Sequence, residues 1–281
     1  MSIARMKKLS AIGLASDRED LMEKLMAMGM VEITAQEEKL NDHMWREMVM
    51  RDGDEKAVST YEAGISRVSQ ALDVIEKHST EKSPFLRTRR PVTADGFKKV
   101  CSEEGMISEK VSHVNSLSAK HAEHSNLINK TESLKLSLMP WADYDLPLDD
   151  LGTRTTDILL GVLPAVSDVG LFKGQMEEKV PASEVVPVHK DEEQHYLCIF
   201  CEKTGRVTAE EVFREYGFSK VGFGEIKGTA LENIAEAEGK IEQLQREKEA
   251  IEEEIRAYEK DKPELELLHD NLIIKRDQIG R

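Results

Sequence analysis

Two cysteines, Cys198 and Cys201, have the C-x-x-C spacing of redox centres and zinc sites. They fall in an apolar stretch typical of a β-strand, where side chains three residues apart point to opposite faces. The chain has 3 cysteines, so no second pair exists to complete a zinc site. We interpret both as packed apolar side chains, and a thiol oxidoreductase stays open as an alternative function.

Two histidines, His121 and His124, lie one turn apart in a stretch predicted to be helical. They could reach a common metal ion, but the residues around them do not form the H-E-x-x-H spacing of a zinc helix. Polar side chains also interrupt the apolar seams of helical bundles and fix their register. We therefore interpret these histidines as polar interruptions of a helical seam, and we expect no metal site and no catalytic residue.

A glycine cluster invites a nucleotide-binding interpretation. Gly222 and Gly224 follow a predicted strand and precede a helix, but Gly228 comes one residue too late for the G-x-G-x-x-G motif. We expect these glycines to shape the chain where it leaves the preceding lobe, and we expect no cofactor.

The composition excludes several classes of protein. The 281 residues include 39 basic and 54 acidic side chains, a net charge of −15, which would repel nucleic acid. Charged residues make up 33% and aromatic residues 5%, so much of the chain should lie in solvated helices. The best apolar run, residues 158–166, is less than half of the about 20 residues that a membrane helix needs. The few cysteines fit a reducing compartment.

The elements that position these residues begin with a β-α-β pattern over residues 1–35. Residues 5–14 have a strand-like apolar end, and residues 30–34 alternate in polarity. The helix between them starts at the capping box of Ser16 and Glu19. Gly29 supplies the left-handed exit from this helix. We expect the first half of a proximal α/β lobe, incomplete in this chain.

Residues 36–140 are predicted to form an outgoing helical arm. Apolar residues recur there at a mean spacing of about 3.5, which is typical of packed helices; they are Tyr61, Ile65, Val68, Leu72 and Ile75. The stretch from residue 92 to 139 contains no proline. A helix that begins near Gly105 could therefore run for roughly 50 Å.

Residues 141–226 predict a distal ferredoxin-like lobe with the order β-α-β-β-α-β. The expected strands are residues 155–163, 184–188, 194–202 and 220–223, and the expected helices are residues 167–179 and 208–216. In the first helix Val169, Phe172 and Met176 form an inward stripe that leaves out Leu171. We predict Leu171, together with Phe218 ahead of the last strand, as exposed apolar anchors for a partner protein.

Residues 227–281 predict a returning coiled-coil arm. One heptad register contains Ile234, Ala237, Ile241, Leu244, Ile251, Ile255, Tyr258, Leu265, Leu272 and Ile279. Pro263 should bend or break this helix. The predicted fold class is therefore α+β, an elongated antiparallel helical bundle or coiled coil capped by two small α/β lobes.

Three stretches of the chain have a characteristic order: residues 6–14 with Val31-Glu32-Ile33, Pro140-Trp141 ahead of residues 145–148, and Leu160-Gly161-Val162-Leu163-Pro164. Together they resemble the subunit I (subunit a) family of rotary V/A-type ATPases and ATP synthases. The order and spacing of these stretches carry the resemblance. A coiled-coil scaffold or adaptor unrelated to ATPases is the main alternative hypothesis.

The resemblance implies a non-catalytic stator arm on the cytoplasmic face of a membrane. It implies that peripheral-stalk subunits E and G bind the distal lobe, that a central-stalk cap subunit faces the proximal lobe, and that a membrane domain forms the path for H⁺ or Na⁺. The sequence ends at Arg281 before any membrane helix or any segment that completes the proximal lobe. We therefore expect part of a longer subunit, without the ion-pathway arginine of the family.

Overall fold

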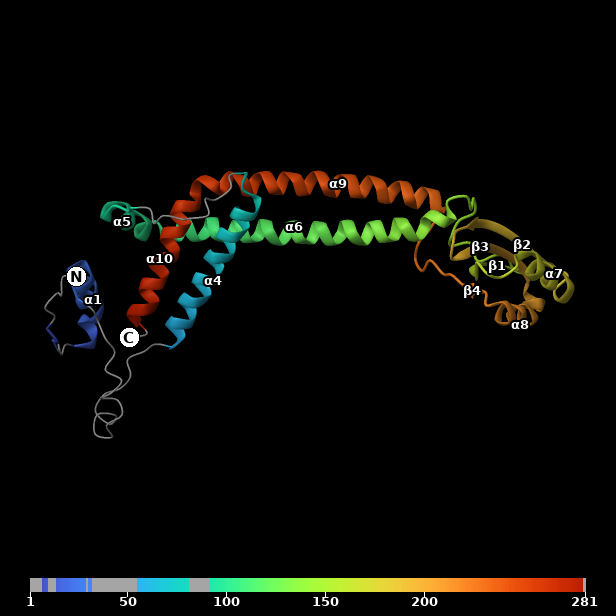
Figure 1. Cartoon of the computed structure of the whole chain (residues 1–281), viewed down its shortest axis with the longest axis horizontal. Coiled ribbons are helices and arrows are strands. Elements are labelled where there is room, and N and C mark those ends of the chain that lie inside the picture. The colour runs from blue at the N-terminus through green and yellow to red at the C-terminus, as the bar shows by residue number, and fades with distance from the viewer. Residues whose placement is uncertain (1–6, 10–13, 29, 32–54, 81–90, 280–281) are drawn as a thin grey trace, which may run out of the picture. The chain divides into compact units, whose positions relative to one another are not determined.

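The computed structural model describes residues 7–9, 14–28, 30–31, 55–80 and 91–279. The chain divides into two compact units, residues 1–116 with 255–281 and residues 117–254. In its described part the first unit is helical, whereas the second combines helices with a four-stranded sheet (Figure 1).

The helices of the first unit begin with α1 (Arg18–Met28), which follows the short 3-10 turn η1 (Ala15–Asp17). This confirms the helix predicted after Ser16, while the strands predicted on either side fall mostly outside the described residues. The unit also contains α4 (Glu55–His78), α5 (Ala94–Ser102), the first part of α6 (Glu104–Leu138) and α10 (Lys262–Ile279).

Apolar side chains of α4, α5, α6 and α10 form the core of this unit. The buried members are Val68, Ala71, Ile75, Val100, Ile107, Val111, Val114, Leu265, Leu268 and Leu272, and the predicted seam residues Tyr61, Ile65 and Leu72 pack against them. One polar side chain, Asn271, is also buried there, and its Nδ2 donates to Oε2 of Glu104 over 3.2 Å. This hydrogen bond offsets the cost of burying an amide.

The break predicted at Pro263 is confirmed. Helix α9 (Ala230–Ala257) ends in the 3-10 turn η4 (Tyr258–Asp261), and α10 begins with Pro263 in its first turn, where a missing N–H costs nothing. The Lys110 ammonium lies 2.6 Å from Oδ1 of Asp261 and 2.9 Å from Oε2 of Glu264. The turn is therefore tied to the first part of α6.

In the second unit the later part of α6 runs antiparallel to α9 (Figure 1). Three cross-helix pairs show the direction, because the α9 partner number falls as the α6 number rises; they are His121–Glu252, His124–Glu247 and Lys135–Glu238. Apolar side chains are buried along both helices, among them Leu117, Ile128 and Leu138 of α6 and Ala237 and Leu244 of α9. The predicted heptad register is confirmed for Ala237 and Leu244.

The sheet has the strand order β2-β3-β1-β4, and every neighbouring pair is antiparallel. Its strands are β1 (Thr156–Pro164), β2 (Ser183–Lys190), β3 (Gln194–Glu202) and β4 (Ser219–Lys220). Helix α7 (Val169–Lys179) joins β1 to β2, and the 3-10 turn η3 (Lys203–Gly205) with α8 (Arg206–Tyr216) joins β3 to β4. The element order is as predicted, and we call residues 156–220 the sheet lobe.

The last strand is shorter than the predicted segment 220–223. It starts at Ser219 and ends at Lys220, although the Val221 N–H still donates to the Leu160 carbonyl over 2.8 Å. Phe223 leaves the sheet and its ring packs edge-on against Trp141, with centroids 5.6 Å apart. Packing against this indole thus overrides the apolar pattern that suggested a longer strand.

The two faces of the sheet belong to two different cores. One face packs against α7 and α8, and this core includes Leu163, Phe172, Met176, Leu197, Ile199, Val212, Phe213 and Phe218. The opposite face packs against the end of α6, the 3-10 turn η2 (Met139–Trp141) and the start of α9; this core includes Leu138, Trp141, Tyr144, Leu148, Leu160, Tyr196 and Ala230. The sheet lobe and these helix ends therefore share side-chain packing.

None of the described helices is both long and apolar enough to cross a lipid bilayer.

Candidate functional site

The predicted anchor Leu171 lies on the outer side of α7. Asp168 caps this helix, since its Oδ1 accepts from the N–H groups of Gly170 at 2.7 Å and of Leu171 at 3.1 Å. The cap fixes the helical phase, so that Phe172 and Met176 are completely buried while Leu171 is 64% exposed. The predicted exposure of Leu171 is confirmed, and its role in binding stays a prediction.

Ion pairs also lie on the two covering helices. The Lys173 ammonium lies 4.0 Å from Glu177, and the Lys179 ammonium of α7 lies 3.2 Å from Glu215 of α8. An exposed apolar side chain on a largely charged surface is a candidate anchor for a partner protein. The outer face of α7 is therefore the better supported half of the predicted site.

The prediction that Phe218 is exposed is wrong. Phe218 is 7% exposed, and its ring lies 4.6 Å from the Phe213 ring and 5.8 Å from the Phe172 ring, centroid to centroid. Gly217 adopts the left-handed conformation with φ of 74°, and the Phe218 N–H donates to the Phe213 carbonyl over 2.8 Å. This Schellman ending folds the chain back, so that Phe218 closes the core.

The sequence held a signal for this burial. In a Schellman ending, the residue after the glycine commonly contacts a residue in the last helical turn. Phe213 and Phe218 stand at these two positions around Gly217. An aromatic pair with this spacing predicts a closed helix end, which removes Phe218 from the candidate site.

Cys198 and Cys201 lie on opposite faces of β3, as the strand geometry predicted. Cys198 belongs to the core with Trp141, and Cys201 to the core with α7 and α8. Burial raises the pKa of the Cys198 thiol to about 11, and burial followed by the Asp157 carboxylate raises the pKa of Cys201. A redox thiol needs the opposite shift.

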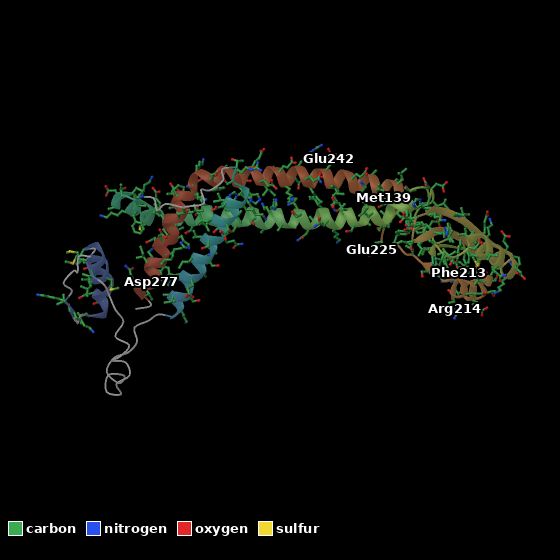
Figure 2. All side chains as sticks on the ribbon, viewed as in Figure 1. Met139, Phe213, Arg214, Glu225, Glu242 and Asp277 are labelled. Atoms are coloured by element: carbon green, nitrogen blue, oxygen red, sulfur yellow. The ribbon has the colours of Figure 1, made fainter. Side chains whose placement is uncertain are left out.

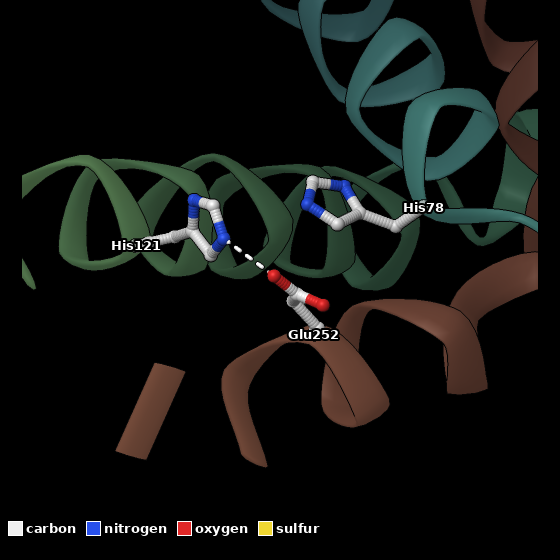
Figure 3. A group of neighbouring side chains, drawn as sticks. All are labelled: His78, His121 and Glu252. Atoms are coloured by element: carbon white, nitrogen blue, oxygen red, sulfur yellow. Dashed lines mark hydrogen bonds and ion pairs between the residues drawn. The ribbon is translucent and has the colours of Figure 1, made fainter. Parts of the chain in front are cut away.

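His121 and His124 each contact a different carboxylate of α9. Nε2 of His121 lies 2.8 Å from Oε1 of Glu252 (Figure 3), and Nε2 of His124 lies 2.8 Å from Oε2 of Glu247. Nδ1 of His124 also lies 2.7 Å from the Lys120 carbonyl, so both ring nitrogens of His124 face acceptors. Both can donate only when the ring is protonated. The histidines thus act as polar bridges between α6 and α9.

The glycine cluster shapes the entry to α9. Gly224 and Gly228 have positive φ values of 62° and 78°. At the start of α9 the Glu232 N–H donates to Oγ1 of Thr229, and Oε2 of Glu232 accepts from the Thr229 N–H. This capping box places the chain's own carboxylate where a dinucleotide phosphate would bind, which disfavours a nucleotide site.

Known proteins are similar to this chain in sequence and in fold. No family model matches the chain. The A-type ATP synthase subunit I of Methanocaldococcus jannaschii is 22% identical over 285 aligned residues, which cover 92% of this chain and 39% of that protein. A solved structure of the cytoplasmic N-terminal domain of subunit I, homolog of subunit a, of V-ATPase superposes with a TM-score of 0.55. That match has 13% sequence identity and covers 94% of this chain and 85% of the other. The resemblance of the sequence motifs, the similarity to the relative's sequence and the similarity to the solved fold therefore all indicate the same subunit.

Proposed function

We propose that this chain is the cytoplasmic arm of a subunit I in a rotary A/V-type ATPase or ATP synthase, where it serves as a non-catalytic stator. The observation that carries the proposal is the fold similarity to the subunit I domain, which extends over 94% of the chain. The curated relative is more than twice as long as the aligned region. In this proposal a membrane domain, which conducts H⁺ or Na⁺, belongs to the same subunit.

The architecture supports a distal ferredoxin-like lobe. Four antiparallel strands in the order β2-β3-β1-β4, with α7 and α8 against one face, have the topology of that fold. In the proposal, residues 1–35 form half of a proximal lobe, and an antiparallel helical bundle connects the two lobes. The bundle comprises the outgoing segment 36–140 and the returning segment 227–281.

The mechanics follow from the packing of α6 and α9. Bending a pair of antiparallel helices makes one slide along the other, and a buried apolar seam resists that sliding. The cross-helix bridges from His121, His124 and Lys135 oppose the same movement. Such a pair can resist rotor torque without any chemical step.

The partners proposed for the arm are the peripheral-stalk subunits E and G at the distal lobe and a central-stalk cap subunit at the proximal lobe. The outer face of α7 around Leu171 is the contact we propose for E and G, since Leu171 is an apolar side chain that is 64% exposed. The arm would then lie on the cytoplasmic face of the membrane that holds the rest of the subunit.

A binding experiment with purified E/G heterodimer tests this function. We expect light scattering after size exclusion to show a stoichiometric complex at low salt, and Leu171→Asp to weaken its affinity at least about tenfold. The matched control is Leu231→Asp on α9, because Leu231 is 62% exposed but lies outside α7. Absence of any complex with the wild-type chain would overturn the stator proposal.

The coiled-coil scaffold is the second candidate, favoured by the heptad register of α9 and α10. A scaffold would associate with itself through its seam, so its mass would rise with concentration and would not respond to E/G. The same mass measurement therefore decides between the two functions.

A further inference from the structure

A groove lies on one side of the α6–α9 pair, next to the sheet lobe. It has a volume of about 390 Å³, and its lining is Glu132, Lys135, Leu136, Met139, Glu238, Ile241, Glu242 and Gln245. Figure 2 labels Met139 at the end of α6 and Glu242 on α9. The heptad pattern did not reveal this groove, because residues on either side of a seam read as solvated positions.

The floor of the groove is apolar and exposed. Leu136 is 66% exposed and Met139 is 51% exposed, whereas the neighbouring Leu138 and Trp141 are buried. Leu136 and Met139 are three residues apart and so point to the same side. Exposed apolar side chains grouped on a polar helical surface mark an interaction site.

The rim of the groove is acidic. It carries the carboxylates of Glu132, Glu238 and Glu242 and a single ammonium group, that of Lys135. Lys135 lies 2.7 Å from Glu238, and the Arg246 guanidinium pairs with Glu242, so the remaining negative charge of the rim is that of Glu132. This carboxylate, together with the net charge of −15 on the whole chain, favours an occupant with an apolar stripe and positive flanks.

We propose that this groove binds an amphipathic helix of a partner protein, with Leu- or Met-like side chains along one face and Lys or Arg beside them. A helix seated against two others buries its i, i+3/i+4 and i+7 side chains, which matches the spacing of the floor. The groove would thereby become part of a three-helix bundle, with Leu136, Met139 and Ile241 in its core. This surface lies on the helix pair and is separate from the α7 face proposed for E and G.

The charge argues against two other occupants. A second copy of this chain would bring the same acidic rim against the groove, within molecules that each carry a net charge of −15. An anionic lipid surface would be repelled for the same reason. A basic helix is the occupant whose charge and shape both complement the groove.

The test uses the full chain and two fluorescent helical peptides of about 18 residues, roughly 27 Å long. Both peptides carry the same Leu stripe, but one has Lys and the other Glu beside it. We expect anisotropy to show saturable binding of the Lys peptide that weakens with salt, and at least about tenfold weaker binding of the Glu peptide. Equal affinities for both peptides, or no binding of the Lys peptide, would overturn the proposal.

Variants locate the binding. Leu136→Asp should weaken binding of the Lys peptide at least about tenfold, whereas Val207→Asp, which changes an apolar side chain of similar exposure on α8, should leave it unchanged. Glu132→Lys with Glu242→Lys should shift preference toward the Glu peptide, a reversal that loss of folding cannot produce. Unchanged affinity in Leu136→Asp would assign the peptide to another surface. A concentration-dependent dimer that Leu136→Asp abolishes would assign the groove to a second copy.

Discussion

Nε2 of His124 lies 2.8 Å from Oε2 of Glu247, so a titratable bridge joins α6 to α9. The Lys120 carbonyl, and then the Glu247 carboxylate, raise the pKa of His124 above its ordinary value. Protonation of His124 is therefore coupled to the packing of the helix pair.

This coupling predicts a pH-dependent stability. The folded-state pKa of His124 exceeds the unfolded-state value of about 6.5. The contribution of the bridge to the free energy of unfolding is therefore fully present below the unfolded-state pKa, and it is lost as pH rises through the folded-state pKa. Urea unfolding of the wild type and of His124→Gln should differ most at the acid end of the range from about pH 5.5 to 8.5. A difference that does not change with pH would contradict the prediction. The His121–Glu252 bridge is present in both proteins and cancels in the comparison.

Phe218 and Leu171 should respond oppositely to truncation. Phe218→Ala removes a ring from the core between Phe172 and Phe213, and should lower the free energy of unfolding by about 3–5 kcal/mol. Leu171→Ala should change it by no more than about 0.5 kcal/mol, because Leu171 is exposed. Chemical denaturation followed by circular dichroism measures both values, and similar losses in the two variants would contradict the assignment.

Two glycines give a further matched comparison. A Cβ added at Gly161 in β1 would lie 2.2 Å from Cζ of Phe218 and 2.5 Å from the Ser219 carbonyl oxygen. Gly161→Ala should therefore destabilise the sheet lobe by about 1–3 kcal/mol.

The control is Gly174, in the exposed part of α7, where an added Cβ meets no atom within 4 Å. Gly174→Ala should stabilise by about 0.5–1 kcal/mol, because alanine favours the helix. The unfolding temperatures of both variants test this comparison. An unfolding temperature of Gly161→Ala equal to that of the wild type would show that Phe218 and Ser219 do not pack this closely against β1.

The thiols should separate into two classes. Cys101 is half-buried, whereas Cys198 and Cys201 are buried with raised pKa values. At about pH 8, Ellman's reagent should modify Cys101 first and the other two only on unfolding, because the thiolate is the reactive form. In Cys101→Ser the early reaction should disappear. A disulfide between Cys198 and Cys201 under mild oxidation would instead favour the oxidoreductase alternative.

The sheet lobe was largely predictable because its local signals agree with its packing. Apolar strands, the Gly217 helix end and the short loops all pointed to the same element order. For Phe223 the prediction failed because a distant contact decides the outcome: this residue leaves the predicted strand to meet Trp141. The burial of Phe218 is decided locally, by its contact with Phe213 around Gly217, which the strand pattern does not take into account.

The helix seams were predictable from heptads alone, but the groove beside them was not. A heptad identifies the residues that face a partner helix, whereas the exposure of Leu136 and Met139 depends on how far α9 covers the side of α6. The partners of the individual cross-helix bridges could not be predicted from the sequence either. Sequence placed His121 and His124 on a seam without showing that each meets its own glutamate.

The shared core of the sheet lobe and the helix ends has a consequence for force transmission. Trp141 lies edge-on to Tyr196 of β3 and to Phe223, with centroids 5.5 Å and 5.6 Å away. A force applied to the sheet lobe therefore acts on these packed rings, and not only on the two connecting segments, residues 149–155 and 221–229. Separation of the lobe from the helix ends under force would expose the indole to water, so the emission of Trp141, measured in a Trp45→Phe background, can report strain at this contact.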